Sequence, residues 1–265
     1  MSRRFPPCRL RFALAVTVAA MFAGPPALRA ADTTGLLPDG TALVLSLNVK
    51  QLLQAPLVRS DEKAFKQLMG EATKALERFG VDPAKDLDRV LLAASDPLKP
   101  ASWLMLLSGR FDANKVEGRL KELARDRKAD VQVADEGGAA VFQCRLPRPA
   151  VPNPTVTPPD RFSLTVLDGA TVAVALERST VSEAVAKKAG RRKAAVASRV
   201  IELVNRMDPR ETLAVVFVPT GGPPATGAAA GLTTITGGMT VADGVKTDLR
   251  LEAKDAESAK RLSSV

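Results

Sequence analysis

The sequence predicts an α+β fold of duplicated ferredoxin-like (split βαβ) units, with an antiparallel sheet and helices on one face. Runs rich in Val, Leu and Thr alternate with segments whose apolar residues recur every three or four positions, as in amphipathic helices. The pairs Asp168-Gly169 and Asp243-Gly244 each separate two alternating runs, which is the pattern of a tight hairpin. One order of elements occurs twice along the chain, which favours a duplication.

Residues 1–30 have the three parts of a cleavable signal peptide. Arginines precede a 13-residue apolar run, Phe12–Gly24, which is shorter than the roughly 20 residues that a membrane-spanning helix needs. A small residue, Ala30, stands where cleavage is expected. We therefore expect an exported protein, periplasmic or secreted, with no membrane span after cleavage. An uncleaved anchor is the alternative, and the sequence leaves the export route, general or twin-arginine, open.

The first α+β unit is expected over residues 31–190. Its strands and helices follow from alternating apolar runs and from apolar residues on one helical face. Asp112 is expected to cap one helix, and Thr180 with Glu183 has the spacing of a capping box for another. The strands are expected at 41–49, 89–94, 102–109, 131–134, 139–144, 162–167 and 171–176, and the helices at 61–79, 112–125 and after Thr180.

The second unit, over residues 191–265, is expected to be incomplete. A helix is predicted over 196–207, a strand over 213–218 and a hairpin over 232–241 and 245–253, followed by a helix capped by Asp255. The Gly- and Ala-rich segment 220–231 replaces the first helix of this unit with a loop. No closing strand follows, so a sheet edge is left open, and we expect either a truncated chain, a partner or a second copy at that edge.

Four stretches resemble phrases found in uncharacterised exported proteins of planctomycete bacteria. They are LLPDGTALVLSLNVKQLL, FGVDPAKDLDRVLLA, SGRFDANKVEGRL and GGMTVADGVKTDLRLEAKDAESAKRL, and they are distributed from near the start of the mature chain to near its end, so that the resemblance covers most of it. These phrases are typical of a fold and contain no catalytic motif. The resemblance therefore implies export and a related fold, and it implies no active residue.

Composition excludes several classes of chemistry. The chain has no His, which excludes Ser-His-Asp and Cys-His catalysis and His-ligated zinc. Cleavage of the signal peptide would lower the net charge from +9 to +4, because five arginines lie in residues 1–30. With so small a positive charge, no nucleic acid is expected as a partner. The mature chain keeps one thiol, Cys144, which is expected to be a small buried residue, with an intermolecular disulfide as the alternative. No cofactor and no metal are expected.

Two clusters of charge remain as candidate sites. Asp82, Asp86 and Asp88 could act as acid and base or hold a cation, but Asp82 followed by Pro83 is typical of a helix start. The basic cluster could bind a polyanion, whereas the alternative is a helix end followed by a solvated turn. The basic cluster comprises Lys187, Lys188, Arg191, Arg192, Lys193 and Arg199.

These observations favour an exported, non-enzymatic binding or scaffold protein of the cell envelope, with no catalytic residue assigned. It is expected to use a sheet surface or an open sheet edge, through an envelope partner or by self-association. A hydrolase that uses carboxylates near Asp82–Asp88 or a Ser/Lys pair is the first alternative. Weak polyanion binding through residues 187–199 is the second.

Overall fold

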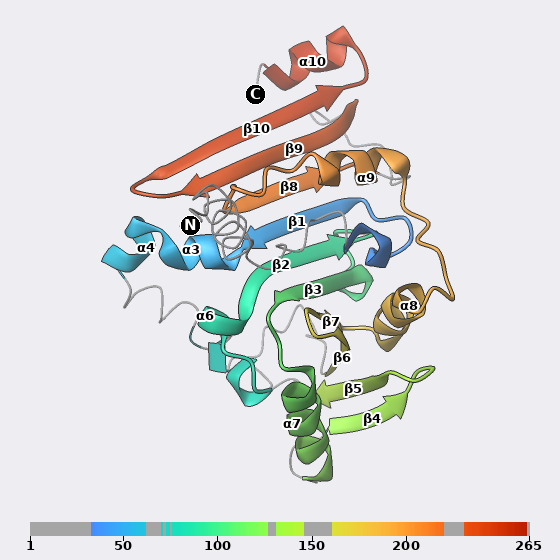
Figure 1. Cartoon of the computed structure of the whole chain (residues 1–265). Coiled ribbons are helices and arrows are strands. Elements are labelled where there is room, and N and C mark those ends of the chain that lie inside the picture. Colours follow the sequence, from blue (N-terminus) through green and yellow to red (C-terminus); the bar gives the residue numbers. More distant parts are fainter. Residues whose placement is uncertain are drawn as a thin grey trace, which may run out of the picture.

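A ten-stranded antiparallel sheet organises the molecule, in the strand order β10-β9-β8-β1-β2-β3-β7-β6-β5-β4 (Figure 1). The computed structural model describes residues 33–61, 70, 73, 74, 76–126, 131–145, 161–219 and 231–263. The strands are β1 (Leu43–Asn48), β2 (Leu87–Ala94), β3 (Trp103–Gly109), β4 (Val131–Asp135), β5 (Ala140–Arg145), β6 (Arg161–Asp168), β7 (Thr171–Ala175), β8 (Leu213–Phe217), β9 (Leu232–Val241) and β10 (Val245–Ala253). Mixed α+β structure with a large antiparallel sheet is thus confirmed.

Short helices frame this sheet. They are η1 (Thr34–Leu36), α3 (Val49–Gln54), α4 (Pro56–Ser60), α6 (Pro83–Asp86), η2 (Pro100–Ser102), α7 (Ala113–Arg125), α8 (Arg178–Lys188), α9 (Ser198–Asn205) and α10 (Ala256–Ser263). Within the part of the chain that the structure describes, no helix is long and apolar enough to cross a membrane. The predicted signal peptide, residues 1–30, lies outside the described residues.

Local polar contacts set several helix starts as the sequence predicts. The carboxylates of Asp112 and Asp255 accept hydrogen bonds from backbone N–H groups three residues later, at 3.0 and 2.7 Å. The predicted capping box at Thr180 and Glu183 is wrong, because α8 begins earlier, at Arg178, and Thr180 lies inside it. Glu183 instead accepts from the backbone of Asp39 and pairs with Lys187.

The strand order differs from duplicated split βαβ units. A split βαβ unit joins parallel strands through a crossover helix. Here β1 and β2 are antiparallel neighbours, with Asn48 at the end of β1 opposite Arg89 near the start of β2. The connection between them therefore returns to the end of the sheet that it left, where α3 and α6 lie (Figure 1). The predicted helix over 61–79 falls mostly outside the described residues, although those described from Gly70 to Arg78 are helical.

The repeated elements are present in another arrangement. The meander β1-β2-β3 and the meander β8-β9-β10 lie side by side, because β1 pairs antiparallel with β8. Each meander is followed by an Asp-capped helix, α7 and α10. The six strands are thus related by an approximate two-fold axis that passes through the sheet between β1 and β8.

Two apolar clusters lie on opposite faces of the sheet. On one face α8, α9 and η1 bury residues such as Val44, Leu106 and Val216. On the other face α7 buries Phe142 and Leu164, and residues at the start of α3 and before α6 join the same cluster. Helices thus cover both faces, so the predicted placement on one face is wrong. Among the described residues, the helices of this cluster leave β8, β9 and β10 uncovered, although the Leu57 N–H of α4 donates to the carbonyl of Ala242, just after β9, at 3.0 Å.

Candidate functional site

The second face of the sheet continues as an apolar surface beyond its helices. Directly opposed residues of antiparallel strands point to the same face, so the register identifies its members. Leu45 faces Leu92 on β2 and Val215 on β8, and the series extends to Met105 on β3 and, through Gly237, to Leu249 on β10. We call this surface the open apolar face: Leu43, Leu45, Leu92, Trp103, Met105, Val215, Phe217, Ile235, Met239, Leu249 and Leu251.

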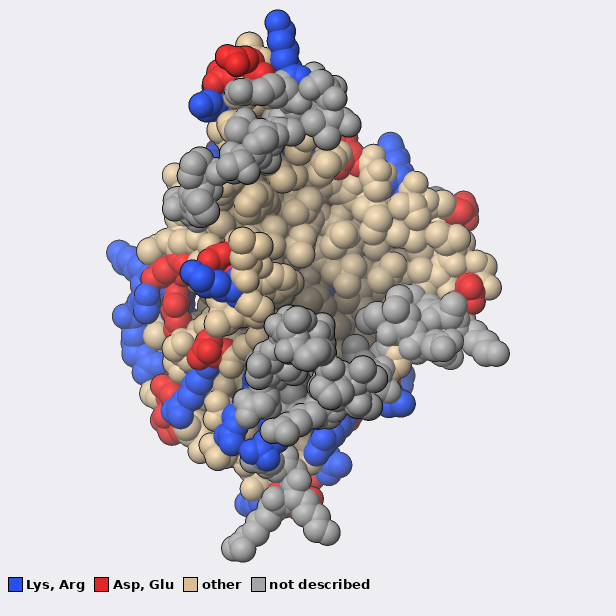
Figure 2. All heavy atoms as spheres, turned by 180° about the vertical axis from the view of Figure 1, so that it is seen from behind, with Lys and Arg blue, Asp and Glu red and all other residues tan. Residues whose placement is uncertain are grey.

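This face has no charged side chain at any of these positions, and much of it is accessible. Leu249 is 62% exposed and Leu251 is 46% exposed, whereas Leu45 and Phe217 are half-buried and belong to neither core cluster. Figure 2 shows it as a broad expanse without Lys, Arg, Asp or Glu, hollowed near its centre. Full burial of a Leu side chain contributes about 1.5–3 kcal/mol, so the exposed leucines forgo much of that stabilisation.

A hollow lies in the part of this face formed by β2, β3, β6 and β7. It has a volume of about 170 Å³. Ligand pockets usually have about 300–1,000 Å³, so this hollow fits a slender group and not a fused ring system. Its apolar lining includes Leu92, Trp103, Met105, Phe162, Val174 and Leu176.

Trp103 lines this hollow and carries a hydrogen-bond donor that is itself buried. Its indole Nε1 is buried and, within the described part of the chain, donates to no acceptor. A buried donor without an acceptor costs about 1–3 kcal/mol, and buried tryptophans usually find a partner for this group. Such an unsatisfied group is a reason to expect an acceptor beyond those that the described residues supply.

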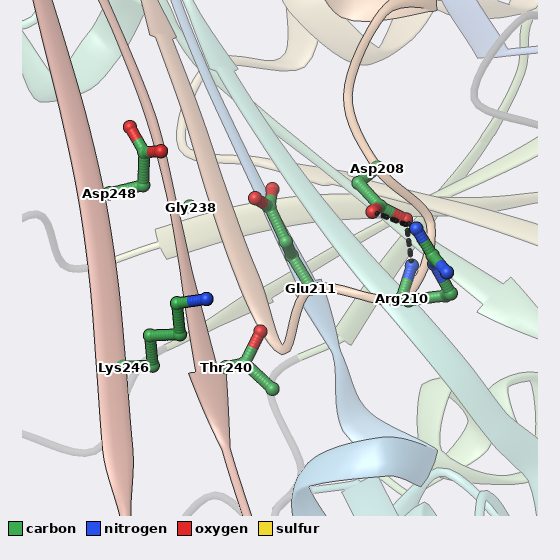
Figure 3. Close-up of a pocket in the computed structure, with 7 residues that line it drawn as sticks. All are labelled: Asp208, Arg210, Glu211, Gly238, Thr240, Lys246 and Asp248. Atoms are coloured by element: carbon green, nitrogen blue, oxygen red, sulfur yellow. Dashed lines mark hydrogen bonds and ion pairs between the residues drawn. The ribbon is translucent and has the colours of Figure 1, made fainter.

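A second, polar hollow of about 380 Å³ lies on the opposite face, between β9, β10 and the segment before β8 (Figure 3). Glu211 lies near its centre, with its carboxylate where a side chain at Gly238 would otherwise stand. Burial and the nearby carboxylates of Asp208 and Asp248 raise the pKa of Glu211. Arg210 does not offset this, since its guanidinium is engaged by Asp208 at 2.9 Å. The described residues contain no cluster of three metal-binding side chains.

The carboxylates of Asp82 and Asp86 are used to start α6. Asp82 accepts from the backbone N–H of Ala84 at 3.0 Å, and Asp86 accepts from the backbone N–H of Asp82 at 2.8 Å. The ammonium of Lys85 also bonds to Asp82 and lowers the pKa of that carboxyl. The predicted helix start is therefore confirmed. Both carboxylates serve this turn, which is a structural role distinct from the hydrolytic one of the first alternative.

The basic cluster is dispersed, and most of its charges are satisfied internally. Lys188 pairs with Asp168, Arg192 with Asp39, and Arg199 with Glu252. The Arg191 guanidinium donates to the carbonyl of Gly137 at 3.2 Å. Lys193 is exposed. These contacts favour the structural interpretation, and polyanion binding through residues 187–199 stays a prediction.

Lys187, the remaining member, is buried and bridges two segments. Its side chain is 1% exposed, and its ammonium pairs with Asp39 at 2.8 Å and with Glu183. The same ammonium donates to the carbonyl of Leu37 at 2.5 Å. The ammonium of Lys187 is thus occupied by two carboxylates and a backbone carbonyl, which is a structural role that holds the segment before β1 against α8.

Cys144 lies in the core of the second face, as its alternating context predicts. Burial raises the pKa of its thiol to about 11. A thiol with such a pKa is an inert apolar side chain at neutral pH.

Sequence reasoning missed the open apolar face, although a signal for it exists. The run Leu43-Val44-Leu45 is apolar at successive positions, so both faces of β1 must be apolar. In β10, leucines alternate with charges, which separates the two faces clearly. No local sequence pattern predicts, however, which strands lie next to β1. The continuous apolar face depends on this order of strands in the sheet.

The comparisons with known proteins concern the fold alone. No protein-family model and no curated protein matches the sequence. Among solved structures, the chain is similar to crystal form III of TP0453, with a TM-score of 0.52 and 12% sequence identity. The match covers 84% of this chain and 80% of that one. At this identity the likeness shows a shared α+β architecture and assigns no residue a role.

Proposed function

We propose that this protein is an exported, non-enzymatic binding protein of the cell envelope, and that its open apolar face binds the acyl chain of an amphiphile. The observation that carries the proposal is the absence of charge at every position of that face from β10 to β3. A large apolar patch on a soluble surface usually marks a binding site. Export is the expectation from residues 1–30 and from the resemblance to exported planctomycete proteins.

The shape of the face favours a chain-like ligand. A slender hollow of about 170 Å³ opens from a broader apolar surface, so an extended hydrocarbon can enter the hollow and lie across the neighbouring strands. A polar ligand would lose its hydrogen bonds to water on such a surface, and burial of an unpaired polar group is unfavourable by several kcal/mol, about 2–7.

The Trp103 indole favours a ligand with an oxygen acceptor. Its N–H has no acceptor in the described part of the chain, and because the atom is buried, a carboxyl or ester oxygen at the polar end of the ligand would reach it only after neighbouring side chains move. One hydrogen bond to this donor contributes about 0.5–1.5 kcal/mol, and more if the acceptor is charged. A fatty acid or an ester-linked lipid has both required parts.

Trp103 also provides the test, because it is the only Trp and the chain has no Tyr. The proposal predicts that a fatty acid with a brominated acyl chain quenches Trp103 fluorescence in a saturable manner, and that an unbrominated fatty acid reverses the quenching. Leu92→Glu, which places a charge in the hollow, should weaken binding at least tenfold, since a buried unpaired charge is strongly unfavourable.

Leu98→Glu is the matched control. Leu98 is 91% exposed in the nearby loop, so the same change there should leave the titration unaltered. Thermal unfolding checks that Leu92→Glu is folded, and Leu92→Gln repeats the test if it is not. Absence of quenching in the wild-type protein, or equal quenching in the Leu92 and Leu98 variants, contradicts the proposal.

A further inference from the structure

The outer edge of β10 is a long strand edge without a partner in the described sheet. β10 pairs with β9 along nine residues, and no strand lies on its other side. All residues from Val245 to Glu252 are exposed, including Val245, Leu249 and Leu251. Native proteins usually shorten, cover or charge such an edge, because its free N–H and C=O groups accept another strand.

The approximate two-fold symmetry of the sheet indicates that this edge accepts a strand. β3 is the counterpart of β10, since each is the third strand of its meander and precedes an Asp-capped helix. The outer edge of β3 is filled by β7, which pairs antiparallel with it from Leu104 to Ser108. The helix after β3 leaves that edge free for β7.

Charges along β10 specify the strand that fits. The side chains of one face are Lys246, Asp248, Arg250 and Glu252, which alternate in sign. In an antiparallel pair of two such strands centred on Leu249, Lys246 stands opposite Glu252 and Asp248 opposite Arg250. Directly opposed unlike charges stabilise a strand pair, and like charges destabilise it. Each contact occurs twice by symmetry, which gives four opposed pairs of unlike charge. Within one copy Glu252 already binds Arg199 at 2.8 Å and Asp248 binds Arg250 at 3.4 Å, so each carboxylate would be shared between two cations.

Other pairings lack this complementarity. Two copies of β10 in a parallel, in-register pair would place each charge opposite its own kind. The other sheet edge, β4, has only Gln132 and Ala134 on the corresponding face, so it offers no charge to match those of β10. A self-complementary patch also closes into a dimer, whereas head-to-tail pairing of β10 with β4 would propagate.

We infer that β10 is a homodimerisation strand, which pairs antiparallel with β10 of a second copy about a two-fold axis at Leu249. The inference is independent of ligand binding. In the dimer the two Leu249 side chains meet on the second face, and the open apolar face of one copy continues into that of the other. The partner strand thus covers part of the exposed apolar surface of β10.

Two charge-altered variants test this inference directly. Lys246→Glu with Arg250→Glu makes the charged face of β10 wholly acidic, and Asp248→Lys with Glu252→Lys makes it wholly basic. Analytical ultracentrifugation at tens of micromolar protein should show a dimer for the wild type and a monomer for each variant alone. An equimolar mixture of the two variants should restore a dimer that contains one copy of each.

The control variant has the same change in net charge as the acidic β10 variant, but at positions outside β10. Lys115→Glu with Lys121→Glu lies on the exposed side of α7, far from β10, and should stay dimeric like the wild type. Circular dichroism checks that all variants keep their secondary structure. A monomeric wild type, variants that dimerise alone, or a mixture that stays monomeric would overturn the inference.

Discussion

The Lys187 side chain is only 1% exposed, and its ammonium fixes the segment before β1 to α8. Its ammonium reaches Asp39, Glu183 and the Leu37 carbonyl, and Asp39 in turn accepts from the backbone of Ala195 at 2.9 Å. The hydrogen bond from Lys187 and the one from Ala195 lower the pKa of Asp39 far below its usual range. Removal of one partner from a buried pair is strongly destabilising, because the other charge is left without compensation.

Asp39→Asn should therefore lower the free energy of unfolding at pH 7, by about 2 kcal/mol. The pKa of Asp39 is lower in the folded than in the unfolded state, so its stabilisation is complete above the unfolded pKa and is lost as the pH falls toward the folded one. The difference between wild type and variant should thus shrink from pH 5 to about pH 2. Urea titrations at several pH values measure this difference in the free energy of unfolding. A difference that is independent of pH would contradict this account.

At the residue scale, the sequence predicts contacts that form within a few positions. The caps at Asp82, Asp112 and Asp255 are confirmed because each carboxylate bonds a backbone N–H two or three residues later. Glu183 has the spacing of a cap as well, yet it bonds to Asp39 and Lys187. A partner that lies 144 positions away in the chain cannot be identified from local spacing.

At the scale of elements, α7 divides the second face into a covered part and an open part. Val116 and Leu120 of α7 pack with Phe142 and Leu164 of the sheet. The open part has no such helix over Leu45 in the described residues, and Leu45 is only half-buried. The same side chain should therefore differ in its contribution to stability between the two parts.

Leu120→Ala should lower the free energy of unfolding by about 2–5 kcal/mol, because it creates a cavity in a packed core. Leu45→Ala should lower it by less than about 1.5 kcal/mol, since much of that side chain already contacts solvent. Urea unfolding of both variants measures the contrast. Equal losses would mean that the open apolar face is packed like the core.

The identity of most elements could be predicted, whereas their order in the sheet could not. The hairpins around Asp168-Gly169 and Asp243-Gly244 and the helix after Asp112 depend on local turn and cap chemistry, and they form as predicted. The pairing of β1 with β8 joins residues about 170 positions apart, such as Leu45 and Val215. The pattern of apolar residues predicts that β1 and β8 are both buried strands, but it does not predict that they are neighbours in the sheet.

At the scale of the whole molecule, the pairing of β1 with β8 explains both proposals. The antiparallel contact of β1 with β8 joins two meanders into one sheet, so apolar positions that are scattered along the sequence become a continuous face. The same arrangement leaves β10 as the counterpart of β3 with a free edge. The sequence predicts an open sheet edge and a binding surface on the sheet. The residues that form the open apolar face could not be predicted, because they depend on the order of the strands.

The most direct test of the central claim is to map where an acyl chain lies on the protein. A fatty acid with a photoreactive group in its chain should, after irradiation, label residues of the open apolar face, such as Leu45, Trp103, Met105 and Val215. Mass spectrometry of the digested protein locates the adducts. Labelling of these strands, competed by an unmodified fatty acid, is the result that we predict. Adducts confined to α8, α9 or the polar hollow around Glu211 would contradict it.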